Sequence, residues 1–313
     1  MAEIVISEFM DEAAIRDVFA GRDVVYDPKL VDRPADLMQL LREARALVVR
    51  NRTQVRGALL EAAIKLEVVG RLGVGLDNID VEACKTRNIA VYPATGANDV
   101  SVAEYVITAM LVLLRRAWFA TPAVIDGQWP RMATIGREVS GKVLGLVGLG
   151  GIARETATRA RALGMTVLAH DPLLPANHPA WQLAAPVSLA ELLASADVLS
   201  LHVPLTPATK NMIGANELAA MHKDAILINA ARGGIVDEVA LVAALQSGHL
   251  GGAALDVFAT EPLDATQGGR FANVPNLILT PHIAGVTEES NVRVSEVTAR
   301  TVLAHLDGKI AAR

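Results

Sequence analysis

Short apolar runs rich in β-branched residues alternate with helical stretches along this chain, and they do so in two separate blocks. Because the runs are apolar along their whole length, they predict parallel strands that helices cover on both faces. The first block holds the runs IVIS at 4–7, ALVVR at 46–50, LEVVG at 66–70 and IAVYP at 89–93. This alternation predicts one small α/β domain in the amino-terminal part of the chain.

The pattern restarts after WPRMATIGREVSGK at 129–142, a polar and irregular segment. The second block contains six further apolar runs, KVLGLVGLGG, TVLAHD, DVLSLHVP, AILINAARGG, AALDV and LILTPH. They predict a second α/β unit. A length of 313 residues also fits two domains, at about 150 residues each.

Composition excludes several classes of protein. Apolar residues make up 52% of the chain and charged residues 20%, as in ordered globular proteins. The 29 basic and 34 acidic side chains leave a net charge of −5, so no nucleic-acid or membrane partner is expected, and any bound anion must be held locally. Cys84 is the single cysteine, and the start MAEIVISEF lacks a basic and then apolar signal segment. We therefore expect a cytoplasmic protein without internal disulfides.

The apolar stretch from Val102 to Leu114 is the segment that could be mistaken for a membrane span. It is thirteen residues long, contains Glu104 and is followed by two arginines, whereas a span takes about 20 apolar residues. Ser101 and Glu104 have the spacing of a capping box, which predicts that a helix starts at Ser101. The stretch is therefore predicted to be a buried helix or a subunit contact.

The segment KVLGLVGLGGIA has the form of a strand, a tight glycine turn and a helix start. Gly148, Gly150 and Ala153 have the spacing of a dinucleotide fingerprint, with one glycine for the turn, one for the approach of a pyrophosphate, and a small residue for close packing. The backbone at Gly151 and Ile152 is expected to contact the cofactor as well. The motif alone is a weak signal, because glycine pairs often end a strand.

Asp171 strengthens this interpretation. It ends the next run, TVLAHD, 23 residues after Gly148, where a carboxylate accepts hydrogen bonds from a ribose diol. The carboxylate would repel the extra phosphate of NADP, and no adjacent arginine is present to receive that phosphate. NAD is therefore the expected cofactor, and a solvated aspartate at a strand end is the alternative.

Polar residues that could take part in chemistry follow the ends of three further runs. Arg232 follows AILINAA, Asp256 ends GGAALD, Glu261 comes five residues later, and His282 follows LILTP. Because ligands of doubly wound sheets lie beyond the carboxyl ends of the strands, we expect these residues to point into one crevice. Each of them alone is more often a packed or surface residue, so their joint placement is the signal.

Nearly the whole chain resembles the D-isomer-specific 2-hydroxyacid dehydrogenases, the family that includes 3-phosphoglycerate dehydrogenase and hydroxypyruvate reductase. The segments that carry the resemblance are RLGVGLDNID at 71–80, SVAE at 101–104, VGLGGIA at 147–153, HVPLTP at 202–207, NAARGGIVDE at 229–238, ALDVFATEP at 254–262 and TPHIAG at 280–285. The family implies an α/β protein with two Rossmann-like doubly wound parallel-sheet domains. An NAD-binding domain at 98–285 would be inserted into a flavodoxin-like substrate domain formed by 1–97 and 286–313. The resemblance also implies a homodimer built through the long helix and the segment after it, and it leaves a tetramer open.

The resemblance implies roles for three catalytic residues. His282 would move the hydroxyl proton beside the cofactor, a task that suits imidazole. Glu261 would be its partner and determine which ring nitrogen carries the proton. Arg232 would grip the substrate carboxylate and polarise the carbonyl, and a planar guanidinium suits such a two-point contact. No metal is expected.

Further contacts are implied for the substrate carboxylate and the cofactor. The backbone amides of Val74 and Gly75 resemble a glycine-rich loop that holds the carboxylate. Asp256 resembles the residue that binds the nicotinamide carboxamide. The other residues expected to border the cofactor are Pro204, Thr206 and Ala230.

The sequence departs from the family pattern at two positions of the glycine turn. Gly151 stands where many relatives have a basic or polar side chain, and Ala153 stands in place of a third glycine. NAD binding is still expected, because the backbone amides remain free to hold phosphate. The regulatory domain that some phosphoglycerate dehydrogenases append after the returning helix is not expected.

Several basic and amide side chains point to a second anionic group on the substrate. VVRNRT places Arg50 and Arg52 after a strand of the expected substrate domain, and they resemble the arginines that meet this group in phosphoglycerate dehydrogenases. Arg131 aligns with a basic residue that those enzymes can supply from a neighbouring subunit, and Asn98 matches an active-site asparagine. Scattered surface arginines are the alternative.

The segments ISEFMDEAAI, RNRT and GRLGVGLDNID also resemble the (S)-sulfolactate dehydrogenase branch of the family. Sulfur raises the ranking of the sulfonate arm, so (S)-sulfolactate has the spatial arrangement of an (R)-glycerate and fits the same D-type pocket. We expect (S)-sulfolactate as the substrate, with 3-phosphoglycerate, glycerate and hydroxypyruvate as alternatives. An NAD-dependent binding module in gene regulation is the alternative from another class, because a fold alone does not decide function.

Overall fold

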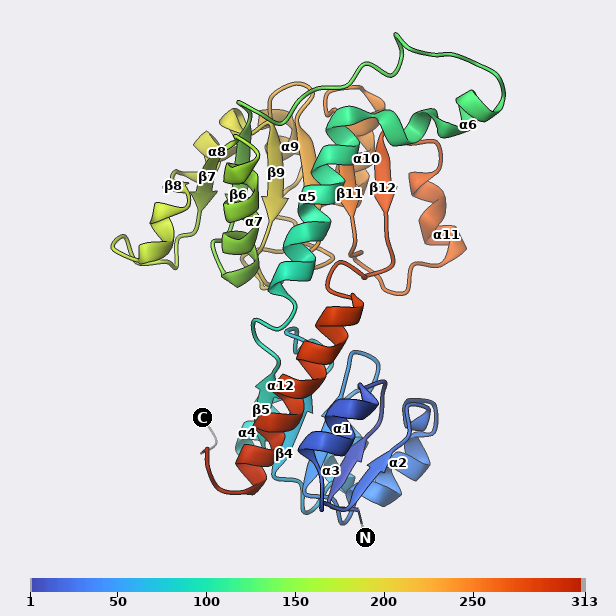
Figure 1. Ribbon diagram of the computed structural model, residues 1–313, viewed down its shortest axis with the longest axis vertical. Coiled ribbons are helices and arrows are strands. Elements are labelled where there is room, and N and C mark those ends of the chain that lie inside the picture. The colour runs from blue at the N-terminus through green and yellow to red at the C-terminus, as the bar shows by residue number, and fades with distance from the viewer. Residues whose placement is uncertain (1, 311–313) are drawn as a thin grey trace. The chain divides into compact units, whose positions relative to one another are not determined.

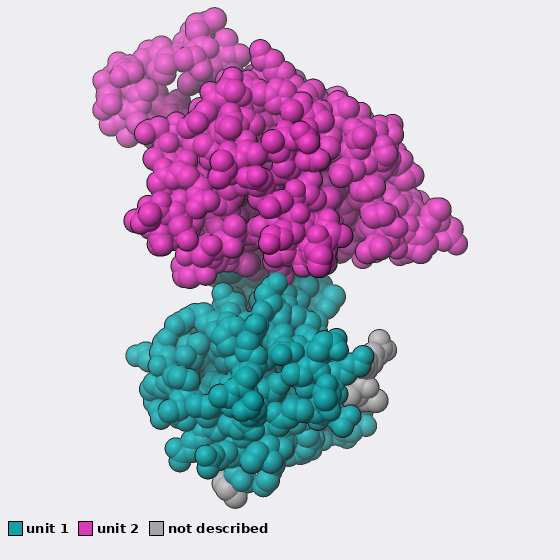
Figure 2. All heavy atoms as spheres, turned by 180° about the vertical axis from the view of Figure 1, so that it is seen from behind, with its two compact units in different colours: residues 1–98, 286–313 teal, residues 99–285 magenta. Residues whose placement is uncertain are grey.

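The computed structural model describes residues 2–310, and the chain forms two compact units (Figure 2). Of these residues, 2–98 and 286–310 belong to unit 1, and 99–285 form unit 2. The chain therefore leaves unit 1 after Asn98 and returns to it at Val286.

Unit 1 is built on a five-stranded parallel sheet with the strand order β2-β1-β3-β4-β5. Its strands are β1 (Ile4–Ile6), β2 (Val24–Tyr26), β3 (Ala46–Val49), β4 (Val68–Arg71) and β5 (Ala90–Pro93). The order 2-1-3-4-5 is that of flavodoxin-like folds. Every residue of β1 and β3 is buried, which is why these runs are apolar without alternation.

Helices cover both faces of this sheet. They are α1 (Glu12–Val18), α2 (Pro34–Leu41), α3 (Gly57–Ala62), α4 (Val81–Thr86) and α12 (Glu288–Leu306), with a short 3-10 helix η1 (Leu30–Asp32). Helices α1 and α12 pack side by side on one face (Figure 1), and α2, α3 and α4 pack on the other. A Cβ at Gly70 in β4 would lie 2.6 Å from the side chain of Val302 and 2.8 Å from that of Thr298. The carboxyl-terminal helix therefore packs closely into the core of unit 1.

Unit 2 is built on a seven-stranded parallel sheet with the order β12-β11-β10-β9-β6-β7-β8. Its strands are β6 (Val143–Val147), β7 (Thr166–His170), β8 (Ala185–Pro186), β9 (Val198–Leu201), β10 (Ile226–Asn229), β11 (Gly252–Leu255) and β12 (Leu277–Leu279). Counted within the unit, this order contains the Rossmann sequence 3-2-1-4-5-6. The strand order reverses between β6 and β9, and such sheets bind ligands beyond the carboxyl ends of the strands at this point. The predicted pair of parallel α/β sheets is confirmed.

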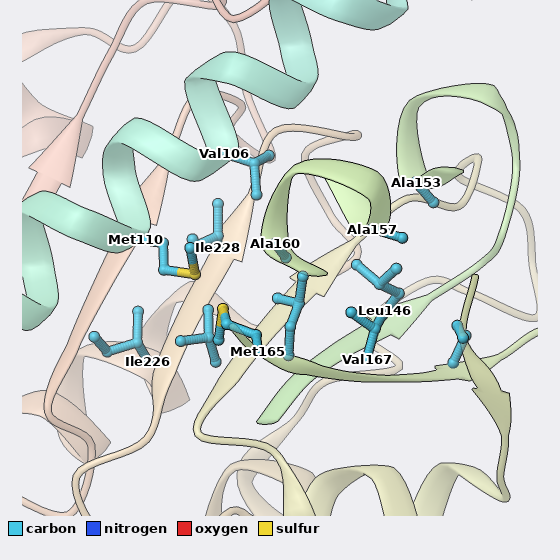
Figure 3. Packing of buried hydrophobic residues seen from close by; sticks show 14 of the residues in the cluster. Val106, Met110, Leu146, Ala153, Ala157, Ala160, Met165, Val167, Ile226 and Ile228 are labelled. Atoms are coloured by element: carbon cyan, nitrogen blue, oxygen red, sulfur yellow. The ribbon is translucent and has the colours of Figure 1, made fainter. Parts of the chain in front are cut away.

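One face of the unit 2 sheet is covered by α5 (Asp99–Arg115) and α7 (Gly151–Ala162), which contact each other. Ala153, Ala157 and Ala160 of α7 are buried, and their small side chains allow the helix to approach the strands closely (Figure 3). Larger apolar side chains that fill this layer are Val106, Met110, Leu146, Val167, Ile226 and Ile228.

The opposite face of the sheet packs against α8 (Leu189–Ser195), α9 (Ala215–Ala220) and α10 (Glu238–Gln246). Between α5 and β6 the chain runs through the segment with α6, which extends away from the sheet (Figure 1). The remaining short helices of unit 2 are η2 (Ala117–Ala120), α6 (Thr121–Ile125), η3 (Pro179–Gln182), α11 (Ala265–Gly268) and η4 (Gly269–Phe271).

Two strands were not predicted, and both are edge strands. β2 is the three-residue run VVY, and β8 is the dipeptide AP. Runs this short show no hydrophobic period. An edge strand also pairs with one neighbour only, so little in its own sequence is needed to define it.

The long apolar helix is present, but its predicted start is wrong. α5 begins at Asp99, two residues before Ser101, which is the third helical residue and is buried. An acidic side chain in the first turn stabilises this earlier start through the helix dipole, so the pair Ser101 and Glu104 does not form the predicted capping box. Among residues 2–310, no helix is long and apolar enough to cross a bilayer.

Candidate active site

The turn between β6 and α7 contains two glycines with different roles. The backbone conformation requires Gly148, whereas Gly150 borders open space. Gly148 has a φ of +89°, and a Cβ there would lie 2.6 Å from the carbonyl oxygen of His202. At Gly150, by contrast, a Cβ would meet no atom within 4 Å. Gly150 is also the N-cap of α7, and no side chain caps the helix there. The first amides of α7 can therefore receive an anion, and the turn fits the pyrophosphate of a dinucleotide.

The departure at Gly151 has a structural cause. A Cβ at this position would lie 2.0 Å from Oδ2 of Asp99, the first residue of α5. Burial raises the pKa of Asp99, and the nearby charge of Glu155 raises it further. A larger side chain at residue 151 would therefore displace this carboxylate. Ile152 is half-buried beside the turn, and Ala153 is fully buried.

Asp171 follows β7 directly and links the glycine turn to this strand. Its Oδ2 accepts a hydrogen bond from the backbone N–H of Leu149 at 2.9 Å, and its Oδ1 accepts one from that of Leu173 at 3.1 Å. The side chain is thus held in place beside the turn. Each carboxylate oxygen has a second lone pair, so the predicted contact with a ribose diol stays a prediction that this geometry permits.

The loop after β10 carries Arg232 and is held by Asn229, which is almost fully buried. The side chain of Asn229 donates to the carbonyl oxygen of Arg232 at 2.9 Å and accepts from the N–H of Ala231 at 3.1 Å. A Cβ at Gly233 would lie 1.7 Å from the carbonyl oxygen of Phe258. The absence of a side chain at Gly233 therefore allows the Arg232 loop to contact the loop that carries Glu261.

The loop after β11 holds Glu261 through its own backbone. The N–H of Phe258 donates to Oε1 of Glu261 at 2.9 Å. The N–H of Ala259 donates to Glu238 at 2.7 Å, and Glu238 also pairs with Arg270 at 3.1 Å. Each polar contact here satisfies a backbone or carboxylate group that would otherwise lie unpaired in a partly buried loop.

Glu261 and His282 form a hydrogen bond of 2.7 Å between Oε2 and Nδ1. Burial raises the pKa of Glu261, but the hydrogen bonds from His282 and Phe258 and the charges of His282 and Arg232 lower it overall. A carboxylate can only accept, so Nδ1 of His282 carries a proton. The neutral ring is then basic at Nε2, as a general acid/base requires. The sequence prediction that Glu261, and not Asp256, faces this ring agrees with the contact.

Asp256 is fully buried, in contrast to the half-exposed side chain of His282. Its carboxylate accepts hydrogen bonds from Thr280, Ile283 and Ala284 at 2.6–2.8 Å. In this conformation the side chain holds the turn around His282. The contact predicted between Asp256 and the nicotinamide carboxamide stays a prediction, because it would require this carboxylate to become accessible.

The other residues predicted to border the cofactor lie after β9 and β10. Pro204 and Thr206 are exposed in a loop that Thr209 holds, since its hydroxyl donates to the Pro204 carbonyl at 2.6 Å and accepts from the Thr206 N–H at 2.8 Å. Ala230 is half-buried directly after β10. These positions are at the carboxyl edge of the sheet, where the predicted contacts would be made.

In unit 1, a buried carboxylate organises the loop that carries Arg50 and Arg52. Glu8 follows β1 and accepts four backbone N–H groups from residues 50–53 at 2.9–3.3 Å. The guanidinium of Arg50 donates to Oδ1 of Asn291 at 2.7 Å and lies 5.8 Å from the ring centroid of Phe9. Burial lowers the pKa of Arg50, although its charge is retained at any physiological pH. Arg50 is therefore a preorganised cation.

Arg52 differs from Arg50, because its largely exposed side chain forms an ion pair with Asp32 at the surface. Exposed pairs of this kind hold a side chain only weakly. The guanidinium groups of Arg50 and Arg52 therefore form hydrogen bonds to different residues, Asn291 and Asp32.

The predicted carboxylate loop and Asn98 retain unsatisfied polar groups. Within residues 2–310, the amides of Val74 and Gly75 donate to no protein acceptor. Oδ1 of Asn98 is buried and likewise has no hydrogen-bond partner in the described part of the chain. Such groups are costly unless a ligand or water satisfies them, and this agrees with a binding role.

Arg131 lies in the segment after α6 and is exposed. Within residues 2–310, its guanidinium forms no ion pair with an acidic side chain. Its predicted role, in the site of a second subunit, stays a prediction.

Five residues of these networks were not predicted: Glu8, Phe9, Tyr105, Thr280 and Asn291. Glu8 and Phe9 follow the run IVIS, so the rule that ligands lie beyond strand ends could have found them. Thr280 lies two residues before His282. Tyr105 and Asn291 are on helices, and nothing in their spacing indicates a role.

We expect Gly148→Ala to reduce the stability of the fold and Gly150→Ala to reduce the affinity for NADH. The first adds a Cβ against the His202 carbonyl and strains the left-handed backbone, so it should lower the free energy of unfolding by about 1–3 kcal/mol. The second has open space, and should leave stability unchanged but weaken NADH binding, because the methyl group would occupy the approach of the phosphate. Urea unfolding and NADH fluorescence titration measure the two effects. Equal losses of stability would contradict this distinction.

Comparison with known proteins supports one family. Residues 107–284 match the family described as D-isomer specific 2-hydroxyacid dehydrogenase, NAD binding domain. The (S)-sulfolactate dehydrogenase of Chromohalobacter salexigens is 54% identical over 303 residues, which cover 96% of this chain and 97% of that protein. The D-3-phosphoglycerate dehydrogenase of a Synechocystis species is 39% identical over 302 residues, but the chain spans only about half of it, 54%. The crystal structure of a D-lactate dehydrogenase from Aquifex aeolicus, complexed with NAD and lactic acid, has a TM-score of 0.83 at 28% identity, with 97% of this chain and 96% of that chain covered.

The family match lies entirely within unit 2 and includes the glycine turn, Asp171 and the loops that carry Arg232, Glu261 and His282. The likeness to a dehydrogenase over nearly the full length of both proteins extends this to unit 1. The fold alone did not distinguish an enzyme from a binding module, and the match to this family decides for an enzyme. This chain belongs to the D-isomer-specific 2-hydroxyacid dehydrogenases and is an NAD-dependent oxidoreductase, as its sequence predicted.

Proposed function

We propose that this enzyme interconverts (S)-sulfolactate and its 2-keto acid with NAD. The observation that carries the reaction is the 2.7 Å hydrogen bond between Glu261 and Nδ1 of His282, since it leaves Nε2 as the basic atom. The observation that carries the substrate class is Arg50, a cation whose guanidinium is held by Asn291 and forms no salt bridge with a carboxylate among residues 2–310. A 2-hydroxy acid with a second anionic group would give its hydroxyl proton to His282 and place its second anion at Arg50.

In the direction of oxidation, Nε2 of His282 takes the hydroxyl proton of the substrate. Bound NAD supplies the acceptor for the hydride that leaves the same carbon. The C–H and O–H bonds break and the C=O bond forms, so the alcohol loses two electrons and two hydrogens. Glu261 stabilises the imidazolium that results and keeps the ring in one orientation, as carboxylates do for catalytic histidines.

Arg232 and the loop at Val74 and Gly75 serve the substrate carboxylate in this proposal. A guanidinium binds a carboxylate through two parallel N–H groups, and the amides of Val74 and Gly75 have no protein acceptor within residues 2–310. Arg232 would also polarise the developing carbonyl. The buried amide oxygen of Asn98 has no hydrogen-bond partner among residues 2–310, so it would accept a donor that arrives with the bound ligand.

Several arguments rank (S)-sulfolactate ahead of the alternatives. The relative with 54% identity over nearly its full length is a (S)-sulfolactate dehydrogenase. 3-Phosphoglycerate is the second candidate, because it also has an anionic group at the far end and because phosphoglycerate dehydrogenases are among the relatives. Glycerate and hydroxypyruvate have no such group and would leave Arg50 unpaired.

We also propose that two copies of the chain associate through the segment after α5. Seven large apolar side chains are exposed along this stretch: Trp118, Phe119, Val124, Ile125, Trp129, Met132 and Ile135. A concentration of exposed apolar residues of this kind marks an interaction surface. Arg131 lies among them and would be supplied to the site of the second copy. The dimer is the proposed assembly, and a tetramer of paired dimers is the alternative. A cytoplasmic location, which suits the free thiol of Cys84, is also proposed.

His282→Ala should lower kcat with sulfolactate at least about a hundredfold, because the group that accepts the proton is lost. NADH binding should change little, since the glycine turn and Asp171 are intact. Stopped-flow turnover and NADH fluorescence titration measure the two. A wild-type preparation that oxidises 3-phosphoglycerate, glycerate or lactate with NAD but not sulfolactate would contradict the proposed substrate.

Arg50→Ala should raise KM for sulfolactate about tenfold or more, because a charge-assisted contact to the far anionic group is removed. The matched variant Arg52→Ala removes a guanidinium already paired with Asp32, and a smaller change is expected. Steady-state rates are compared with sulfolactate, 3-phosphoglycerate, glycerate and lactate. Lactate lacks the second anion, so its KM should be unaffected. An equal change with lactate would contradict the proposed contact.

Ile125→Asp combined with Trp129→Asp should convert a dimer into monomers, because burial of two carboxylates in an apolar interface is unfavourable. Ile64→Asp, at another exposed apolar position in unit 1, is the control and should leave the assembly intact. Sedimentation velocity reports the mass of each variant. Dimers that persist in the double variant would show that this segment is not the interface.

A further inference from the structure

The backbone of His282 has a conformation that side chains rarely adopt. Its φ is +57°, in the left-handed region, and His282 is neither glycine nor asparagine. A non-glycine residue in this region persists only where the surroundings hold it. The question is therefore which groups hold the turn that carries the imidazole.

Three consecutive N–H groups of the turn converge on one residue, Asp256. The N–H of His282 donates to the backbone carbonyl of Asp256, that of Ile283 to its Oδ1, and that of Ala284 to its Oδ2, each at 2.8 Å. Asp256 is fully buried at the end of β11. The orientation of its carboxylate therefore determines where the turn lies.

Two hydroxyl groups extend this network away from the site. Thr280 donates its hydroxyl proton to Oδ1 of Asp256 at 2.6 Å. The hydroxyl oxygen of Thr280 in turn lies 2.6 Å from the hydroxyl of Tyr105 on α5. A hydroxyl has one proton to donate, and that of Thr280 is given to the carboxylate. Tyr105 is therefore the donor to Thr280. Burial and the charge of Asp256 raise the pKa of Tyr105 to about 12, so this donor keeps its proton across the working pH range.

We propose that Tyr105 and Thr280 are positioning residues for catalysis, and that their hydroxyl chain orients Asp256 and thereby the turn that presents His282 to Glu261 and the substrate. Neither hydroxyl touches the imidazole. They act through Asp256, whose Oδ1 would lose one of its two donors without Thr280. The carboxylate could then rotate about its χ2 angle and release the amides of Ile283 and Ala284. The catalytic consequence rests on the proposed function, whereas the effect on the His282 turn does not.

The first test is kinetic. Thr280→Val replaces the hydroxyl by a methyl group of the same shape and should lower kcat about tenfold, because small displacements of a proton-transfer group are costly. Tyr105→Phe should lower kcat less. Both variants should leave the NADH dissociation constant within about twofold of wild type. Thr280→Val should lower the urea midpoint, because the buried carboxylate of Asp256 loses a donor. Thr280→Ser keeps a hydroxyl and should restore kcat.

The control is Tyr92→Phe, which removes a hydroxyl that lies 3.3 Å from Nδ1 of His305 in unit 1. The double variant Tyr105→Phe, Thr280→Val should be no worse than Thr280→Val alone, because removal of the Thr280 hydroxyl already breaks the chain. Unchanged kcat in Thr280→Val would overturn the proposal. A loss of kcat in Thr280→Val that Thr280→Ser does not restore would also overturn it. An equal loss of NADH affinity in Thr280→Val would do the same.

The second test needs no turnover. Imidazole ¹⁵N–¹H spectra of the unliganded protein resolve the seven histidines, and the His282 signals are identified by their loss in His282→Gln. Thr280→Val should shift these signals, and Tyr92→Phe should not. Unmoved His282 signals in Thr280→Val would overturn the proposal. If the wild-type enzyme oxidises none of the acids but the His282 signals move, the proposed substrate reaction fails and the hydroxyl chain stands.

Discussion

The hydrogen bond between Glu261 and His282 is the interaction on which the chemistry of this enzyme depends. It joins two loops that follow different strands of one parallel sheet, β11 and β12. A proton-transfer group must be held to within a fraction of an ångström, yet loops have few backbone hydrogen bonds of their own. Contacts with other parts of the chain must therefore hold Glu261 and His282 in position.

Buried carboxylates supply much of that rigidity. Asp256 accepts the amides of the His282 turn, Glu238 accepts an amide of the Glu261 loop, and Glu8 accepts four amides of the loop at residues 50–53. In each case an acidic side chain satisfies backbone N–H groups that no helix or sheet can satisfy. A buried charge is tolerated because it is surrounded by donors. Buried carboxylates that accept loop N–H groups thus occur in both units, each time in a loop that carries candidate site residues.

Glycines contribute in a complementary way, because they let backbones approach where a side chain would prevent contact. Gly233 allows the Arg232 loop to lie against Phe258, Gly148 allows the glycine turn to lie against His202, and Gly151 leaves room for Asp99. Gly150 differs from these three, since the space beside it is open. In the glycine turn, Gly148 and Gly151 therefore allow close packing, whereas Gly150 leaves the phosphate site accessible.

The fold class, the NAD cofactor and the family could all be predicted from the sequence, because they depend on local patterns. Continuous apolar runs are required where a parallel sheet is covered on both faces, and a glycine turn followed by Asp171 is required where a dinucleotide binds. The placement of Arg232, Glu261 and His282 after strand ends was also visible. Edge strands β2 and β8 were missed because they are too short for a period. The start of α5 was misplaced because the helix begins at Asp99, whose acidic side chain suits the first turn.

Only the tertiary structure decided how these residues are held. Tyr105 is 175 positions from Thr280 in the chain, and Arg50 is 241 positions from Asn291, yet each pair forms a hydrogen bond. No spacing in the sequence predicts such contacts, since they arise when a helix packs beside the loop that follows a strand. The sequence by itself determined the strands, the glycine turn and the chemical groups at the strand ends. Packing determined which amide, hydroxyl and carboxylate meet, because hydrogen bonds between distant segments exist only after the chain has folded.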